Sequence, residues 1–307
     1  MNIINKILDK WPGIKLDYMQ KRHFFGVSQS AYCSVAKYLG ALGKAKHDAV
    51  LKIVKDNISG TIKYYSDLKC EVKEPIRDDC PIWVMWWQGE ENMPPIVKRC
   101  VASIRNHCGQ HPVNVLSRSN YSDYIQLPSS IQQKLENNGW IPCLSDLIRF
   151  GLLKEHGGIW LDATLLTTKP IGHFEQSLYS IRHEVGNPRF VLNGDKWSAF
   201  MFASTKGHPV PCFIYDALIE YFTKNDYLID YWLIDYTIAT MYLENKGLAE
   251  YIDNLPLDNP TCLALLLERD MPYSEKRLNE IFAANRFNKL DWRLPVRKGT
   301  MLKEALK

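Results

Sequence analysis

The chain has 307 residues, of which 46% are hydrophobic and 12% aromatic, so it can bury a sizeable core and its composition argues against disorder. Its formal net charge of +4 is too small to indicate nucleic-acid binding, but it is compatible with binding a diphosphate or an anionic membrane surface. The eight cysteines never fall in a C-x-x-C spacing, which argues against the common zinc motifs.

The N-terminal part of the chain predicts helices. Its first residues, MNIINKILDKWPGIK, are interrupted by charges and a proline and do not match a secretory signal peptide. We therefore expect a cytoplasmic protein, and peripheral contact with the inner face of the membrane stays open. Alanines, leucines and lysines recur at helical spacing, so we interpret residues 1–79 as a helical extension and residues 80–307 as the main domain. The extension covers a sheet, forms a dimer contact or faces a membrane.

From Pro81 onward the pattern changes to strands that alternate with helices. Apolar runs predict strands at Ile82–Trp87 and Val113–Leu116, and helices are predicted over Met93–Ile104 and Ser129–Asn138. This alternation predicts an α/β fold whose central sheet is mostly parallel and is covered by helices on both faces. Ligands in such folds bind beyond the carboxyl ends of the strands.

A charged helix follows in the middle of the chain. Asp146 and Arg149 are three residues apart, so both project from the same side of the predicted helix. Ser145 is the predicted N-cap, and Gly157-Gly158 is expected to end the helix because glycine accepts a left-handed backbone. A structural ion pair followed by a simple helix cap is the alternative interpretation of this pattern.

A short apolar strand, Ile159–Leu161, is predicted directly after the two glycines, and Asp162 stands where this strand should emerge. A carboxylate beside an apolar run is costly when it is buried without a partner. A cation, a sugar hydroxyl or Arg149 are the three partners that we consider for Asp162.

The order of these features resembles a known family. SDLIR, from Ser145 to Arg149, and GGIWLDAT, from Gly157 to Thr164, match the pattern S-D-x-x-R followed by G-G-x-(W/Y)-x-D-x-(D/T). The pattern is that of the capsular polysaccharide synthesis proteins, a bacterial branch of glycosyltransferase family 32, and more distantly of the glucosylating domains of large clostridial toxins. The resemblance covers the chain from roughly Pro81 to its end. It implies a GT-A-type nucleotide-sugar-binding fold.

The activity implied by the resemblance is transfer of a hexose. The donor would be a UDP-sugar, the acceptor a capsular polysaccharide at the cell surface or a lipid-linked oligosaccharide, and the configuration of the anomeric carbon would be retained. A retaining enzyme can use a protein nucleophile, but no residue in the sequence clearly has that role. We therefore favour front-face displacement, in which the leaving phosphate takes the acceptor proton.

The resemblance also implies which residues bind the donor. Trp86 matches a tryptophan that stacks on uracil in the related families, and Gln88 follows it at the end of the first strand. Asp146 and Arg149 match positions that hold the sugar hydroxyls and the bridging phosphate region, so we predict both donor-binding and catalytic roles for them. A position in the hydrophobic core is the alternative for Trp86, since the chain contains nine tryptophans.

The motif around Asp162 implies a metal ion. Asp162 and Thr164 are the predicted ligands of Mn²⁺ or Mg²⁺, and Trp160 and Ala163 are predicted to line the donor site with Asp162. A threonine hydroxyl is a poorer ligand for a hard cation than a carboxylate, so Thr164 weakens the prediction of metal binding. The same substitution motivates an alternative function, a catalytically silent protein that binds nucleotides or glycans.

Two later residues complete the predicted site. Asp235 is flanked by apolar residues in an aromatic helix and is the preferred candidate for a further catalytic carboxylate, ahead of Asp230. Lys289 is predicted to reach the diphosphate from a mobile C-terminal lid.

Overall fold

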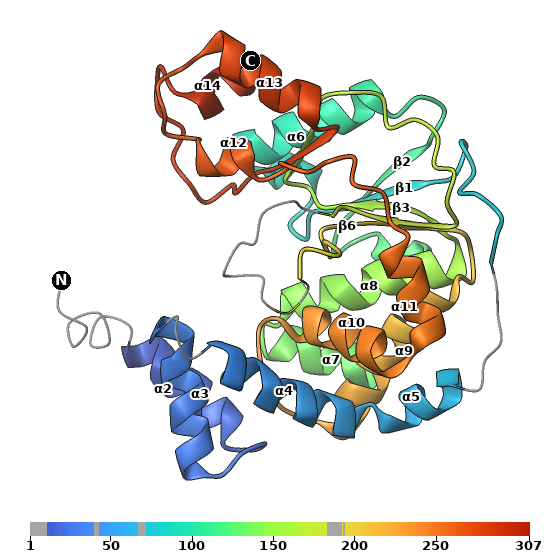
Figure 1. Cartoon of the computed structure of the whole chain (residues 1–307), viewed down its shortest axis with the longest axis vertical. Helices are drawn as coiled ribbons and strands as arrows, with labels where there is room; N and C mark the ends of the chain where they lie inside the picture. The colour runs from blue at the N-terminus through green and yellow to red at the C-terminus, as the bar shows by residue number, and fades with distance from the viewer. Residues whose placement is uncertain (1–10, 40–42, 67–71, 183–191, 193) are drawn as a thin grey trace.

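The computed structural model describes residues 11–39, 43–66, 72–182, 192 and 194–307. A central sheet of five strands, in the order β2-β1-β3-β6-β5, lies between two layers of helices (Figure 1). The strands of this sheet are β1 (Ile82–Met85), β2 (Val113–Leu116), β3 (Gly158–Leu161), β5 (Leu178–Ser180) and β6 (Met201–Ser204). A separate two-stranded sheet consists of β4 (Leu165–Thr167) and β7 (Phe287–Lys289). The predicted α/β fold is confirmed.

Three adjacent strands of the sheet run parallel, and two more extend it on one side. β1 pairs in parallel with both β2 and β3, as the alternating pattern predicted. β6 pairs antiparallel with β3, and β5 pairs antiparallel with β6. The strand that leads to Asp162 therefore lies between a parallel and an antiparallel neighbour.

Helices cover both faces of this sheet. In Figure 1, α6 and the C-terminal helices lie on one side of it, and α7 to α11 lie on the other. The helices are α2 (Trp11–Lys21), α3 (Val27–Leu39), α4 (Gly43–Asn57), α5 (Ser59–Ser66), α6 (Pro95–His107), α7 (Ser129–Asn137), α8 (Ile141–Glu155), α9 (Pro209–Lys224), α10 (Leu233–Glu244), α11 (Lys246–Asp253), α12 (Ala264–Leu267), α13 (Glu275–Ala284) and α14 (Met301–Ala305). Short 3₁₀ turns span Glu90–Asn92 and Tyr121–Asp123. None of the helices within the described ranges is long and apolar enough to cross a bilayer.

Alternate side chains of the central strands face different hydrophobic clusters. Trp83 and Trp160 point into the cluster formed with α8, α9 and α10. Ile82 and Ile159, their neighbours in sequence, point into the cluster that contains the apolar face of α6. Because successive strand residues face opposite sides of a sheet, the short apolar strands are buried on both faces.

The glycine pair ends α8 as predicted, but the helix begins earlier than expected. Gly157 and Gly158 have φ values of 70° and 104°. A Cβ on Gly158 would lie 2.3 Å from the carbonyl oxygen of Pro81, so the close approach to β1 also requires glycine. Ser145 lies inside α8, which begins at Ile141, and its predicted role as the N-cap is wrong. Pro142 explains the earlier start, because the first helical turn needs no N–H from proline.

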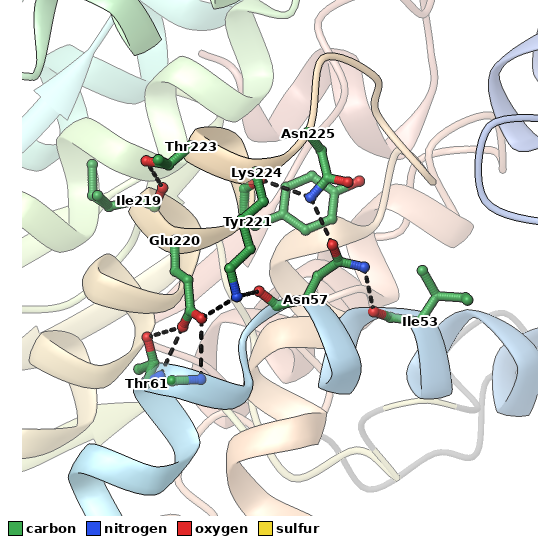
Figure 2. A network of polar contacts seen from close by, with 10 residues as sticks. Ile53, Asn57, Thr61, Ile219, Glu220, Tyr221, Thr223, Lys224 and Asn225 are labelled. Carbon is green, nitrogen blue, oxygen red and sulfur yellow. Dashed lines mark hydrogen bonds and ion pairs between the residues drawn. The ribbon is translucent and has the colours of Figure 1, made fainter.

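The described N-terminal helices dock on the main domain. Glu220 of α9 accepts hydrogen bonds from the backbone N–H groups of Gly60 (3.0 Å) and Thr61 (2.7 Å), at the first turn of α5. Figure 2 shows Glu220 beside Thr61. A carboxylate is favourable there because the helix dipole is positive at that end. Lys224 donates to the Asn57 carbonyl at 3.0 Å, which ties α9 to the end of α4 as well.

Apolar packing joins the same helices to the sheet. Val50, Val54 and Ile58 belong to the hydrophobic cluster of α8, α9 and α10, so α4 and α5 share a core with the main domain. The division at residue 79 therefore does not separate two hydrophobic cores. Residues 1–10, 40–42 and 67–71 of the predicted extension lie outside the described residues.

Candidate active site

The carboxyl ends of β1 and β3 lie next to each other at one edge of the sheet. The two strands are parallel, with Trp83 paired to Trp160. Trp86 lies three residues after Trp83, and Asp162 lies two residues after Trp160. Neighbouring strands of a sheet are about 4.8 Å apart. The structure thus brings the two predicted halves of the donor site to the same edge. Gln88 lies in the turn three residues after the end of β1 and is exposed.

Arg149 of α8 is buried at the centre of this site. Its guanidinium lies 3.1 Å from Asp146 through Nη1 and 3.1 Å from Asp162 through Nη2. Nη1 also donates to the carbonyl oxygen of Ala199 at 2.6 Å, and the guanidinium carbon lies 4.9 Å from the centre of the Trp160 ring. The planar fork of donors thus connects two carboxylates and the segment that precedes β6.

Asp162 accepts hydrogen bonds through both carboxylate oxygens. Oδ1 accepts from Arg149 Nη2 at 3.1 Å and from Trp160 Nε1 at 3.0 Å. Oδ2 accepts from Lys289 Nζ at 2.7 Å. Burial alone would raise the pKa of Asp162, but Lys289 and Arg149 outweigh it and lower the pKa below its ordinary value. Asp162 is therefore ionised, with Arg149 as one of its partners.

Lys289 reaches Asp162 from a distant part of the sequence. It lies on β7, which pairs antiparallel with β4 so that Leu165 stands opposite Lys289. Its Nζ also donates to Thr164 Oγ1 at 2.9 Å. The prediction of a mobile lid is wrong for Lys289, because the residue is held in a strand beside the Asp162 turn.

Asp146 and Asp235 are the other carboxyl groups of the site. Burial raises the pKa of Asp146 to about 7, with Arg149 opposing the shift and the charges of Asp162 and Asp235 adding to it. Burial also raises the pKa of Asp235 on α10 to about 6, although Trp197 Nε1 donates to it at 3.2 Å. Carboxyl groups whose pKa values are driven apart by their surroundings are typical of functional sites.

Asp230, the other acid that we considered on this segment, has a structural role. It is buried, and its carboxylate forms an ion pair with Lys46 at 2.6 Å. The preference for Asp235 over Asp230 agrees with these contacts, because Arg149 is among the groups that lower the pKa of Asp235, whereas Lys46 and Lys21 are the cations that lower the pKa of Asp230.

Trp160 and Ala163 support the site from below its surface. Their exposed fractions are 1% and 6%, so neither offers a broad face to a donor. Trp160 orients Asp162 through its indole N–H and lies under Arg149. Trp160 thus positions Asp162 in the structure, and the donor contact of Trp160 and Ala163 stays a prediction.

Trp86 is connected to the Asp162 side through the C-terminal segment. Its ring meets Trp292 edge to face, with the ring centres 5.4 Å apart. Trp292 follows Lys289 by three residues, which span at most about 10 Å. Trp86 is half-buried and Trp292 is 38% exposed, so an aromatic surface lies beside the polar cluster. The sequence did not predict this contact.

Tyr231 is a further aromatic residue that sequence reasoning missed. It is 53% exposed, and burial of its hydroxyl together with the charge of Asp146 raises its pKa. It therefore lies beside the acidic part of the site. The run of aromatic residues before α10 was the available signal.

Comparison with known proteins identifies the family. Residues 36–305 match the family of capsular polysaccharide synthesis proteins, which is most of the chain. The chain belongs to that family. The resemblance that the SDLIR and GGIWLDAT motifs suggested is therefore confirmed.

Two individual proteins are also similar to this member of the capsular polysaccharide synthesis family. The O-glycosyltransferase braB of Annulohypoxylon truncatum is 32% identical over 105 residues, which is 30% of this chain and 24% of that protein. This chain therefore matches only about a quarter of the length of that relative. The solved structure of PaToxG glycosyltransferase aligns with a TM-score of 0.42 and 18% identity, covering 68% of this chain and 82% of that one.

The predicted metal ligands of this family member do not fit a divalent cation as they are arranged. Asp162 Oδ2 and Thr164 Oγ1 both accept from the Lys289 ammonium, and Asp162 Oδ1 faces Arg149. A cation between Asp162 and Thr164 would meet these two positive charges. Within the described ranges, no three His, Cys, Asp or Glu side chains are grouped to hold a metal. A Mn²⁺ or Mg²⁺ site stays a prediction that rests on the resemblance.

The raised pKa of Asp146 predicts that the free energy of unfolding falls as the pH rises toward neutrality. Its pKa of about 7 in the folded protein exceeds the ordinary value of 3.8, so the folded state holds the proton more tightly than the unfolded chain. The stability contributed by this proton is complete below about pH 4 and is lost as the pH rises to about 7. We expect Asp146→Asn to increase the free energy of unfolding at about pH 8 by up to about 4 kcal/mol.

Urea unfolding at two pH values measures this effect. At about pH 4 the carboxyl of Asp146 is protonated and resembles the asparagine amide, so the two proteins should have similar stability there. A gain of equal size at both pH values would show that the ionisation of Asp146 is not its cause.

Proposed function

We propose that this chain is a glycosyltransferase that transfers a hexose from a UDP-sugar to a capsular polysaccharide or lipid-linked oligosaccharide. The observation that carries the proposal is the cluster of Asp162, Arg149 and Lys289 at the strand ends, beside Trp86. Membership in the capsular polysaccharide synthesis family and the name of its O-glycosyltransferase relative support the same activity.

The polar cluster offers separate groups to the two parts of a nucleotide-sugar donor, its diphosphate and its sugar. Arg149 and Lys289 supply fixed positive charges, and such charges stabilise a leaving diphosphate without reorganisation during the reaction. Asp146 and Asp235 supply oxygens that accept hydrogen bonds from sugar hydroxyls. Asp162 holds both cations in position, because Arg149 donates to one of its carboxylate oxygens and Lys289 donates to the other.

The reaction that we propose retains the configuration of the anomeric carbon. The acceptor hydroxyl attacks this carbon from the face that the diphosphate leaves, and the bond between the carbon and the phosphate oxygen breaks with both electrons on that oxygen. The same oxygen takes the acceptor proton, so a glycoside and UDP are formed. The cationic side of the site favours this step because negative charge develops on the departing diphosphate.

A donor screen tests the proposed activity. Purified protein is incubated with the common UDP-sugars and with capsular polysaccharide or lipid-linked oligosaccharide as the acceptor, with and without Mn²⁺, and the release of UDP is measured. We expect release from one preferred UDP-sugar. UDP binding without turnover of any donor would instead identify a catalytically silent nucleotide-binding protein, and neither binding nor turnover would reject a UDP-sugar donor.

Trp86→Ala is expected to weaken UDP binding by about 1–3 kcal/mol, the usual contribution of an aromatic ring stacked on a base. Isothermal titration with UDP measures the change. The neighbouring Trp87 packs on Tyr121 with ring centres 5.8 Å apart, so Trp87→Ala is the matched control and should bind UDP normally. An unchanged dissociation constant for Trp86→Ala would exclude the stacking role.

A further inference from the structure

The position between Asp162 and Thr164 is filled by a side chain of the protein itself. Lys289 Nζ lies 2.7 Å from Asp162 Oδ2 and 2.9 Å from Thr164 Oγ1. We propose that the Lys289 ammonium acts as a built-in cation that binds the donor diphosphate in place of a divalent metal ion. This inference rests on the proposed function, because it requires a donor that carries a diphosphate.

The ammonium is held in place by several contacts. The Lys289 backbone N–H donates to the Cys262 carbonyl at 2.8 Å, and the next residue, Leu290, donates to the Thr164 carbonyl at 2.9 Å. The ammonium also lies 4.9 Å from the centre of the Phe200 ring. A charge fixed in this way before the donor binds needs little reorganisation when the diphosphate arrives.

The charges around Lys289 explain why a threonine at position 164 is compatible with diphosphate binding. Lys289 and Arg149 are two cations that share the ionised Asp162. An acid at position 164 would neutralise Lys289, whereas the Thr164 hydroxyl accepts a hydrogen bond and leaves the charge in place. Lys289 is therefore paired with one carboxylate, Asp162, which it shares with Arg149.

The ammonium also retains hydrogen-bonding capacity. A lysine ammonium has three N–H donors, and among the described residues two are directed to Asp162 Oδ2 and Thr164 Oγ1. The third is available to a phosphate oxygen. As the bond from the anomeric carbon to the phosphate oxygen breaks, the electron pair moves to the diphosphate and Lys289 stabilises it while keeping its own proton.

Lys289→Met tests the inference, because methionine keeps an unbranched side chain over Phe200 and removes the charge. UDP and uridine are titrated into the protein in a buffer that contains EDTA. We expect Lys289→Met to bind UDP roughly 10- to 100-fold more weakly than the wild type, the usual effect of losing a hydrogen bond to a charged group. Uridine affinity should not change, since uridine has no phosphate.

Two further variants control this titration. Lys289→Arg keeps the positive charge and should retain UDP binding better than Lys289→Met. Lys276 lies exposed on α13, so Lys276→Ala should match the wild type and shows the effect of removing a remote positive charge. Circular dichroism and thermal melting confirm that each variant is folded.

The outcomes separate this inference from the proposed function. UDP binding to the wild type in EDTA that is lost in Lys289→Met supports the inference. Wild-type binding that requires Mn²⁺ or Mg²⁺, or equal UDP affinity of Lys289→Met and the wild type, overturns it while leaving a UDP-sugar donor intact. No UDP binding with or without metal rejects the proposed donor itself, and the inference with it.

Discussion

Asp162→Asn is expected to lower donor turnover about 100- to 1,000-fold, the range seen when one preorganised electrostatic group of an active site is removed. The carboxylate bridges Arg149 and Lys289 through its two oxygens, so it fixes both cations in the orientation that we propose for the diphosphate. An amide keeps the size of the side chain, but it is neutral and presents N–H groups to one of the two cations. The measurement is the rate of UDP release with the preferred UDP-sugar.

A second aspartate provides the control for that rate. Asp253 also pairs with a lysine, Lys196, at 2.5 Å, but on the surface. Asp253→Asn should therefore release UDP at the rate of the wild type. Normal turnover by Asp162→Asn would remove Asp162 from the active site and would contradict the proposed role of the whole cluster.

Arg149→Ala is expected to have the largest effect on stability, lowering the free energy of unfolding by about 3–5 kcal/mol, the usual result of removing one partner of a buried ion pair. The side chain of Arg149 is 7% exposed and faces both Asp146 and Asp162, which would lose their shared cation. The Ala199 carbonyl would also lose a donor. Urea unfolding at neutral pH measures the loss.

Two comparisons sharpen this prediction. Arg149→Lys restores a charge but cannot reproduce the planar fork of donors, so it should recover only part of the stability. The ion pair of Arg118 with Glu136 is exposed on the arginine side, and Arg118→Ala should cost less than about 1 kcal/mol. Equal losses for Arg149→Ala and Arg118→Ala would contradict a buried charge network.

The parts of the site that sequence reasoning located are those set by local spacing. Asp146 and Arg149 share a face because they are three residues apart in a helix, and they form an ion pair in the structure. Trp86 and Asp162 lie at the same edge of the sheet, because each directly follows a buried strand and parallel strands end at the same edge. Neither inference required knowledge of distant contacts.

The contacts that escaped prediction join segments far apart in the sequence. Lys289 and Asp162 are 127 residues apart, and they meet only because β7 pairs with β4 in one particular register. A sequence pattern shows that a short strand is present but not its partner or its register. The Trp86 contact with Trp292 depends on the same pairing, since Trp292 lies just beyond β7.

The Trp160 result illustrates a different difficulty. The motif places Trp160 two residues before Asp162, and a tryptophan beside a polar site is equally consistent with ligand stacking and with core packing. In the structure Trp160 packs in the core, because Phe150 and Phe202 belong to the same hydrophobic cluster and Trp160 itself is 1% exposed. Sequence spacing does not reveal the depth of a side chain below the surface.

A crystal structure of the protein with UDP is the most direct test of the central claim, that the nucleotide-sugar donor binds at the carboxyl ends of β1 and β3. We expect uracil against the Trp86 ring and the diphosphate at the Lys289 and Arg149 side of Asp162. UDP bound elsewhere on the molecule, with Trp86 and Lys289 free of contact to it, would contradict this assignment of the site.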